Sequence, residues 1–227
     1  MQHFVVGLGE VGGAVQSILG CDGFDPSKST EKSRKTYDML HICFPYSPNF
    51  GLIVRSYIDA YQPKYVLVHS TVPVGTCGRL GVAHSPIRGR HPDLKESILN
   101  FKKYIGGEGA NDIADELAKY GMKTEVVATA SETEAGKLFD LMQYGMSVLL
   151  NKEIWQFCQD NQLDFDTVYT KFNQSYNDGY ASMGYPQFIR PILEYMEGKI
   201  GGHCVVQMMS LLETYSAKRI IQANRDL

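Results

Sequence analysis

The stretch that decides the fold is Gly7-Leu8-Gly9-Glu10-Val11-Gly12, which follows a short apolar run at Phe4–Gly7. Glycines at these spacings, between a strand and a helix, are typical of dinucleotide-binding units. Gly7 permits a tight turn, Gly9 lets the backbone approach a pyrophosphate, and Gly12 lets the helix pack closely on the strand. The free N–H groups at the start of the helix favour phosphate. We therefore predict that Gly7, Gly9, Glu10, Val11 and Gly12 form a cofactor-binding loop.

An acidic residue lies where this type of loop uses one. Asp25 follows a short second strand and stands about 20 residues after the glycines, the spacing at which a carboxylate binds the ribose diol of NAD. We therefore predict NAD as the cofactor. Four cations that follow could instead accommodate the 2′-phosphate of NADP, which leaves that alternative open; they are Lys28, Lys32, Arg34 and Lys35.

Short apolar runs alternate with helical or loop segments through the first half of the chain. Such alternation predicts β-α-β units and a parallel sheet with helices on both faces. The runs after Phe4–Gly7 are Met39–Phe44, Tyr65–His69, Lys103–Gly106 and Thr124–Ala128. We predict a Rossmann-like, doubly wound parallel sheet in residues 1–128, followed by a helical domain in residues 129–227.

One long helix dominates the predicted second domain. Glu132–Asp160 contains no proline, and its apolar residues recur at steps of three and four. A helix of this length often contacts a partner, so we expect it to pair with its copy in a homodimer. The many Tyr, Asn and Gly residues of Thr167–Gly198 predict short helices and loops. Residues Val205–Arg225 are expected to form a further helix.

Composition excludes several classes of protein. The chain has 227 residues, of which 44% are hydrophobic and 21% charged, and its formal net charge is −3. These values argue against a disordered chain and against a general nucleic-acid binder. No apolar run is long enough to span a membrane, and no signal peptide is evident. Five scattered cysteines without a C-x-x-C pair indicate reduced thiols, so we expect a cytoplasmic protein; they are Cys21, Cys43, Cys77, Cys158 and Cys204.

Three further segments identify a known family. They are His69–Thr76 (H-S-T-V-P-V-G-T), Glu134–Lys137 (E-A-G-K) and Gly201–Cys204 (G-G-H-C). Together with the glycine loop, and in this order, they resemble the nucleotide-sugar 6-dehydrogenases, which act on UDP-glucose, UDP-N-acetylmannosamine or GDP-mannose. His41–Pro48 also resembles the strand and loop that precede the nicotinamide in that family.

This resemblance implies an activity and its residues. The family oxidises a primary alcohol to a carboxylate with two NAD, through a cysteine thiohemiacetal and a thioester. Cys204 matches the nucleophilic cysteine, Lys137 the active-site lysine, and Thr71 the threonine near the nicotinamide. Ser70 and Pro45 are then also expected to contact the cofactor. A thiolate is a suitable nucleophile for an aldehyde, and a lysine can stabilise a developing alkoxide.

A loop rich in cations is a candidate for binding an anionic, sugar-like substrate. It follows the fourth predicted strand, and ligands of parallel sheets bind where strands end. We expect substrate contacts from His84, Arg88, Arg90 and His91, and from Arg190, Gly202 and His203 nearer the C-terminus. The histidines do not have a metal-binding spacing, so no metal is predicted.

Departures from the family leave two alternatives open. The family's C-terminal nucleotide-binding domain has no counterpart before the chain ends, Leu141 replaces an asparagine, and a glutamate is missing from the loop at His84–His91. One alternative is a β-hydroxyacid-type dehydrogenase, which makes a single hydride transfer with Lys137 and needs no cysteine. The other is a non-catalytic, dimeric NAD-binding module.

Overall fold

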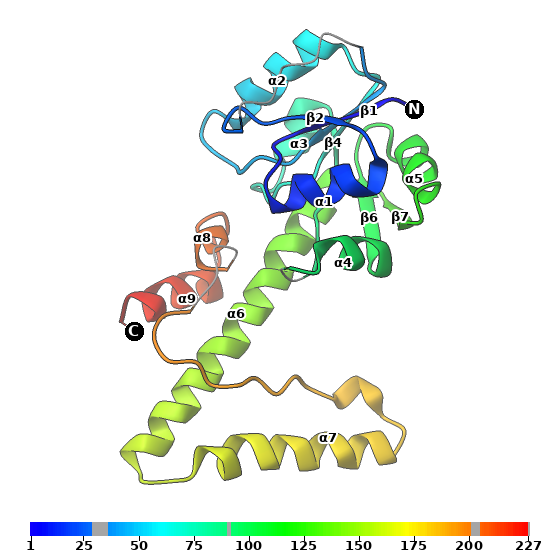
Figure 1. The fold of residues 1–227 in the computed structure, drawn as a ribbon. Helices are drawn as coiled ribbons and strands as arrows, with labels where there is room; N and C mark the ends of the chain where they lie inside the picture. The colour runs from blue at the N-terminus through cyan, green and yellow to red at the C-terminus, as the bar shows by residue number, and fades with distance from the viewer. Residues whose placement is uncertain (29–35, 90–91, 201–204, 227) are drawn as a thin grey trace. The chain divides into compact units, whose positions relative to one another are not determined.

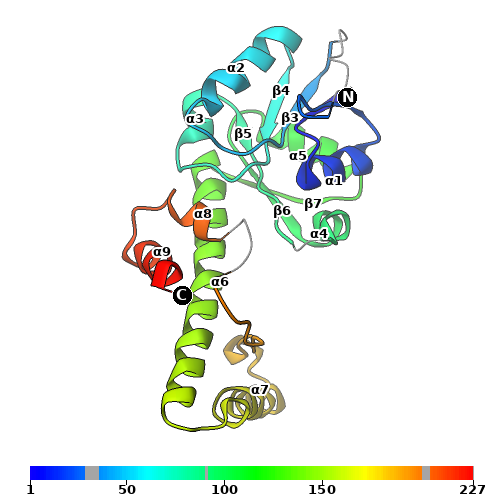
Figure 2. The ribbon, with the colours of Figure 1, turned by 60° about the vertical axis from the view of Figure 1, so that its left-hand side comes forward.

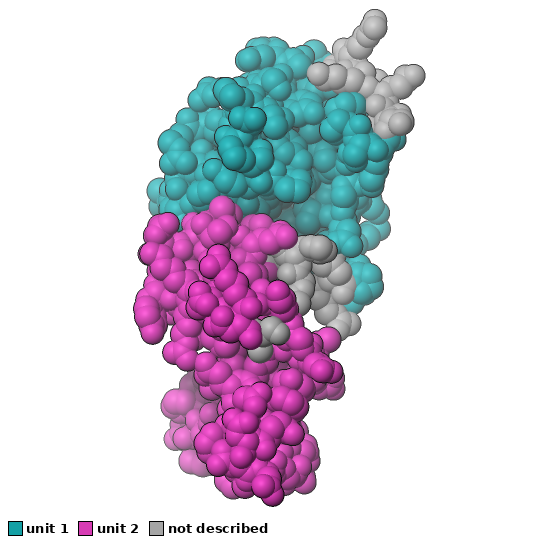
Figure 3. All heavy atoms as spheres, turned by 90° about the vertical axis from the view of Figure 1, so that its left-hand side faces the viewer, with its two compact units in different colours: residues 1–138 teal, residues 139–227 magenta. Residues whose placement is uncertain are grey.

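The computed structural model describes residues 1–28, 36–89, 92–200 and 205–226. It divides into two compact units, Met1–Leu138 and Phe139–Leu227, which Figure 3 colours teal and magenta. The first unit is α/β and the second is helical. The predicted division after residue 128 falls just before the long helix, whereas the observed division falls inside it, because the first turns of that helix pack within the first unit.

The first unit is built on one seven-stranded sheet, which confirms the predicted α/β class (Figures 1 and 2). The strand order is β2-β1-β3-β4-β5-β6-β7. The strands are β1 His3–Val6, β2 Asp22–Phe24, β3 Met39–Ile42, β4 Tyr65–Val68, β5 Ala83–His84, β6 Lys102–Gly106 and β7 Lys123–Val127.

The direction of the last two strands differs from the prediction. β1 to β5 are parallel, but β6 pairs antiparallel with β5 through His84 and Gly106, and β7 runs parallel to β6. Between β5 and β6 the described residues form one helix, α4 (Leu94–Asn100), which is about 10 Å long. We infer that so short a helix leaves the chain at the carboxyl edge of β5, and β6 therefore enters the sheet in reverse.

Helices cover both faces of the sheet. One face packs against α1 (Glu10–Leu19), α4 and α5 (Ala110–Ala118), and the other against α2 (Phe50–Tyr61) and α3 (Thr76–Leu80). Strands covered on both faces have apolar residues in continuous runs rather than in alternation. This explains why β1, β3 and β4 are buried at every position.

The order of the strands reverses between β1 and β3. β2 lies on one side of β1, whereas β3 and all later strands lie on the other. Ligands of open α/β sheets bind at such a switch point, outside the carboxyl ends of the strands. The glycine loop follows β1 at this point, so the fold places the predicted cofactor loop where a ligand is expected.

The long helix α6 spans Ala130–Asp160 and is confirmed, although it begins at Ala130 rather than Glu132. A capping box fixes its start: the Glu132 carboxylate accepts the Thr129 N–H at 2.8 Å, and the Thr129 hydroxyl accepts the Glu132 N–H at 3.3 Å. No helix in the described part of the chain is both long and apolar enough to cross a bilayer.

Short helices complete the second unit. They are the π-helix η1 Asp166–Lys171, α7 Phe172–Ser182, the 3₁₀ helix η2 Pro186–Phe188, α8 Val206–Met209 and α9 Tyr215–Asp226. The helix predicted over Val205–Arg225 is therefore broken into two, and the Thr214 hydroxyl accepts the Ala217 N–H at the start of the second. Gly145 of α6 allows close packing, since a Cβ there would lie 2.8 Å from Val205 and 3.0 Å from Ile220.

Candidate cofactor and active site

The glycine loop has the geometry that a pyrophosphate site requires. Gly7 has φ +90°, and a Cβ there would lie 2.8 Å from the Phe44 nitrogen in the loop after β3. A Cβ on Gly12 would lie 1.7 Å from the Gly7 oxygen, so α1 can pack on β1 only with glycine at this position. At Gly9 a Cβ would meet nothing within 4 Å. Gly9 is thus the glycine whose missing side chain leaves open space for a ligand.

The Asp25 carboxylate binds the glycine loop itself. Its Oδ2 accepts the Leu8 N–H at 2.7 Å, and its Oδ1 accepts the Ser27 N–H at 2.9 Å and the Ser27 hydroxyl at 2.7 Å. Hydrogen bonds from Ser27, with that from Leu8, lower the pKa of Asp25. The Lys28 ammonium donates to the Leu8 carbonyl. Asp25 therefore lies beside the loop, as its spacing predicts, and is ionised there.

The loops after β3 and β4 lie next to each other. The Ser70 hydroxyl donates to the Phe44 carbonyl at 2.6 Å. Pro45, the next residue, is exposed, and Ser70 and Thr71 are half-buried. These three predicted cofactor residues therefore lie at the carboxyl ends of adjacent strands, on the same edge of the sheet as the glycine loop.

Glu134 joins the segment at residues 69–76 to helix α6. Its side chain is fully buried, and its two oxygens accept the N–H of Gly75 at 2.5 Å and the N–H of Cys77 at 2.7 Å. An anionic side chain on the free N–H groups at the start of α3 is a favourable arrangement. The sequence contains the E-A-G-K string but gives no sign that its glutamate supports this loop.

Lys137 lies one helical turn after Glu134 and is half-buried. Residues three apart share a face of a helix. Lys137 therefore projects from the same side of α6 as Glu134, which is the side that contacts the loop after β4. The first turns of α6 belong to the first unit. Lys137, Ser70 and Thr71 are therefore all positioned by the same unit.

Burial weakens the acidity of three of the other thiols. It raises the pKa of Cys21 to about 11 and that of Cys43 to about 12, and burial together with Glu134 raises the pKa of Cys77 further. Thiols with raised pKa values are poor nucleophiles at neutral pH. Cys204 lies outside the described residues, as do Gly202, His203, Arg90 and His91.

His84 does not have the setting expected of a substrate-binding residue. It is fully buried, and its Nδ1 lies 2.7 Å from the Thr133 hydroxyl while its Nε2 lies 3.1 Å from the Ser70 carbonyl. Burial lowers its pKa to about 4, so the ring is neutral. With both nitrogens engaged, His84 supports the Ser70 segment instead. Among the described residues, no three metal-ligating side chains converge.

The two described arginines predicted to bind substrate make local contacts. Arg88 donates to the Lys102 carbonyl at 3.1 Å and lies 5.9 Å from the centre of the Phe101 ring. This places Arg88 beyond the end of β5, at the expected edge of the sheet. Arg190 belongs to the second unit, where its guanidinium lies 3.6 Å from the centre of the Tyr176 ring.

Comparison with known proteins gives matches by structure only. No family model and no curated sequence matches the chain. Among solved structures, UDP-D-ManNAc dehydrogenase from Pyrococcus horikoshii is similar with a TM-score of 0.80 and 15% identity, over 99% of this chain and 68% of that one. UDP-glucose dehydrogenase from Pyrobaculum islandicum has a TM-score of 0.72 and 18% identity, over 99% and 68%. The fold is that of these dehydrogenases.

A third similar structure differs in length. The 3-hydroxyisobutyrate dehydrogenase of Mycobacterium tuberculosis has a TM-score of 0.72 and 14% identity, and the match covers 100% of this chain and 94% of that one. The chain is therefore about as long as the 3-hydroxyisobutyrate dehydrogenase and about two thirds as long as the two sugar-nucleotide enzymes. At these identities the likeness establishes the fold.

Proposed function

We propose that this protein is an NAD-dependent dehydrogenase that oxidises an alcohol group of a sugar-like, anionic substrate. The observation that carries the proposal is the open space at Gly9, at the switch point of a sheet whose neighbouring loops hold Ser70 and Thr71. The similar UDP-sugar dehydrogenases support the class of substrate. The order of the motifs along the chain supports the same class.

The residues present fit a dinucleotide. Gly9 at the start of α1 provides no side-chain cap, and the N–H groups at a helix start favour a pyrophosphate. Asp25 is held ionised beside the loop, which favours a ribose diol over a 2′-phosphate. Pro45, Ser70 and Thr71 would lie along the nicotinamide half. NAD, when bound, supplies the electron acceptor for alcohol oxidation.

In this proposal the chain's own residues handle the substrate oxygen and carbon. Lys137 stabilises negative charge on the alcohol oxygen or takes its proton, and Thr71 positions the reacting carbon. Cys204 adds its sulfur to the aldehyde carbon, and the oxygen takes up a proton to give a thiohemiacetal. Arg88, Arg90, His91, Arg190, Gly202 and His203 are proposed to contact the substrate.

A second candidate function is a β-hydroxyacid-type oxidation. The match in length to 3-hydroxyisobutyrate dehydrogenase favours it, because both chains are covered almost completely. Under this alternative the reaction ends after one oxidation, Lys137 is essential and Cys204 is dispensable.

Replacing Gly9 by alanine tests cofactor binding. A Cβ at Gly9 enters open space and φ is −69°, so folding stability is expected to change by less than about 1 kcal/mol. The same methyl group would stand where the pyrophosphate approaches, and NAD affinity is expected to fall on the order of tenfold or more, or about 1.4 kcal/mol. Isothermal titration calorimetry measures the affinity.

Gly179→Ala in α7 is the matched control, because it also adds a methyl group in open space but in the other unit. It is expected to leave NAD affinity unchanged. Wild-type affinity in Gly9→Ala would contradict a pyrophosphate site at the glycine loop.

We also propose that the protein is a cytoplasmic homodimer paired through α6. Four large apolar side chains of that helix are about half exposed; they are Phe139, Tyr144, Leu150 and Phe157. Exposed apolar residues gathered on one element are typical of an interface. Sedimentation velocity at micromolar concentration is expected to give a dimer, and a monomer would contradict the proposal. The free thiols among the described cysteines support a reducing compartment.

A further inference from the structure

Three histidines and a lysine are buried on the face of the sheet that packs against α1, α4 and α5. The exposed fractions are 4% for His3, 0% for His41, 3% for His69 and 5% for Lys103. Burying this many ionisable groups is costly unless they bind one another. The proposed reaction assigns no role to any of them.

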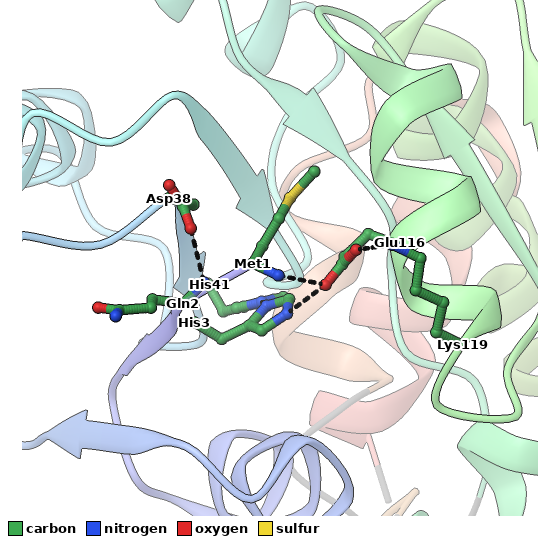
Figure 4. A network of polar contacts seen from close by, with 7 residues as sticks. All are labelled: Met1, Gln2, His3, Asp38, His41, Glu116 and Lys119. Carbon is green, nitrogen blue, oxygen red and sulfur yellow. Dashed lines mark hydrogen bonds and ion pairs between the residues drawn. The ribbon is translucent and has the colours of Figure 1, made fainter.

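These side chains form a continuous hydrogen-bonded chain that ends on a carboxylate. Glu116 Oε1 lies 3.2 Å from His3 Nε2, and His3 Nδ1 lies 3.0 Å from His41 Nε2. His41 Nδ1 lies 2.9 Å from His69 Nε2, and His69 Nδ1 lies 3.3 Å from Lys103 Nζ. Figure 4 shows the first part of this chain, with the tilted rings of His3 and His41 next to each other and the Glu116 carboxylate bonded to His3.

The chain runs diagonally across the sheet from its amino edge to its carboxyl edge. His3 is the first residue of β1, but His41 pairs with Val5, two residues further along. His41 in turn pairs with Leu67, two residues before His69. Diagonal neighbours on one face are within reach of aromatic side chains, which is why the rings meet at centroid distances of 5.2 and 5.3 Å.

Each of the three rings is neutral and can therefore both donate and accept. Burial lowers the pKa of His3, His41 and His69 below the ordinary value. A neutral imidazole has one N–H and one acceptor nitrogen. With the proton on Nε2 of every ring, His3 donates to Glu116, each later ring donates to the ring before it, and Lys103 donates to His69. In this arrangement Lys103 donates to two acceptors, His69 Nδ1 and the Ser85 carbonyl, which lie 3.0 Å from each other.

The two ends have opposite proton affinities. Lys119 and the Met1 amino group, at 2.6 and 2.9 Å, lower the pKa of Glu116 to about 2. Burial lowers the pKa of Lys103 to about 7. Lys103 also donates to the Ser85 carbonyl at 3.0 Å. The lysine end therefore gains and loses a proton near neutral pH. The glutamate end stays ionised, and its partner Lys119 is exposed to solvent.

We propose that Lys103, His69, His41, His3 and Glu116 form a proton relay between the carboxyl edge of the sheet and solvent at its amino edge. This rests on the proposed dehydrogenase function, since alcohol oxidation releases one proton for each pair of electrons passed to the cofactor. The Lys103 end is at the cofactor edge, because Lys103 contacts His69 and Ser85, which directly follow the carboxyl ends of β4 and β5.

The proton balance of one passage is simple. Neutral Lys103 takes the released proton and gives a proton to His69 Nδ1. His69 then gives its Nε2 proton to His41, His41 gives its Nε2 proton to His3, and His3 gives its Nε2 proton to Glu116, which releases it to water. Each ring ends with its proton on Nδ1. Before the next passage, each imidazole ring must rotate, or the protons must move back along the chain, so that Nε2 carries the proton again.

Other charged groups around the two ends set the pH dependence. Lys103 interacts electrostatically with His41 of β3, with Cys43 and His69 just after β3 and β4, and with His84 of β5, all of which are neutral. On the α4 side, Arg88 is a further cation beside it. His3 is faced by Glu116, the Met1 amino group, Asp38 and Tyr120.

The first test needs neither substrate nor cofactor. In full-length protein labelled with ¹⁵N-histidine, the ring nitrogens of His69 are expected to shift around pH 7, together with the titration of Lys103, although His69 itself ionises at lower pH. In Lys103→Met this change is expected to be absent, while His3 keeps its proton on Nε2, bonded to Glu116. A His69 titration that is identical in both proteins overturns the relay.

The second test is turnover. Lys103 must be neutral to accept a proton, so kcat/KM of the wild type is expected to rise with pH through about 7. His41→Gln keeps a polar side chain but cannot pass a proton, and kcat is expected to fall roughly tenfold or more with KM unchanged. Glu116→Gln, a second variant in case His41→Gln does not fold, is expected to lower kcat as well.

The matched control is Glu125→Gln, which removes an exposed carboxylate paired with Lys102 on the same sheet. It is expected to leave the rate and its pH profile unchanged. Wild-type kcat and pH profile in both relay variants would overturn the relay. If the wild type itself produces no NADH, the proposed function fails, and the histidine titration alone decides the relay.

Discussion

Cys204→Ala is expected to bind NAD with wild-type affinity and to lose acid formation by about a thousandfold or more. The magnitude follows from the covalent route, in which no other group can hold the aldehyde while water and cofactor exchange. Burial raises the pKa values of Cys21, Cys43 and Cys77, so none of them can substitute. Mass spectrometry of the product, together with calorimetry for NAD, measures both effects.

Cys21→Ala is the control for this variant. Its thiol is half-buried between α1 and β2, with a pKa of about 11, and its removal is expected to leave the product and the rate unchanged. Acid formed by Cys204→Ala at the wild-type rate would eliminate the thiohemiacetal route and favour the single oxidation of the β-hydroxyacid type.

Lys137→Met is expected to lower kcat by about 10² to 10⁴, with NAD affinity unchanged. The lysine is proposed to act on the alcohol oxygen, and methionine retains its length and apolar stem but carries no charge and no proton. Both dehydrogenase alternatives require Lys137, whereas only one requires Cys204. The pair of variants therefore separates the two chemistries, with stopped-flow NADH absorbance as the measurement.

A lysine remote from the glycine loop provides the comparison. Lys218 is an exposed residue of α9 that pairs with Glu213, and Lys218→Met is expected to show wild-type turnover. If Lys137→Met retains full activity while NAD still binds, Lys137 has no role at the substrate oxygen.

The sequence predicted those parts of the fold that depend on local pattern. The strands at β1, β3 and β4 stand out because a strand buried on both faces is apolar throughout. The glycine loop is recognisable from its own spacing, since Gly12 packs directly on Gly7, although Phe44 after β3 also limits the space at Gly7. The long helix was found from its periodicity, and the T-x-x-E capping box at Thr129–Glu132 would have fixed its first residue.

Features that depend on pairing between distant segments were not predicted. The reversed direction of β6 follows from the short connection through α4 and not from a residue in either strand. Glu134 supports the loop at Gly75 and Cys77 from 57 or more residues away. His84 was expected to contact substrate from a loop, but it belongs to β5, where it is fully buried.

The buried histidines carried a usable signal that was not recognised. His3, His41 and His69 each interrupt or end an apolar strand of a sheet predicted to be covered on both faces. A polar residue in such a place must find a buried partner. Which partner it finds depends on the register between strands, since a shift of one residue turns the side chain to the other face.

The most direct test of the dehydrogenase proposal is to incubate the wild-type protein with NAD and a deproteinised metabolite extract. NADH is followed by absorbance, and the metabolites are compared by mass spectrometry before and after. We expect NADH to form while one anionic, sugar-like alcohol disappears and its acid appears, with two NADH for each acid. Binding of NAD without any turnover would contradict the proposal and would favour a non-catalytic NAD-binding module.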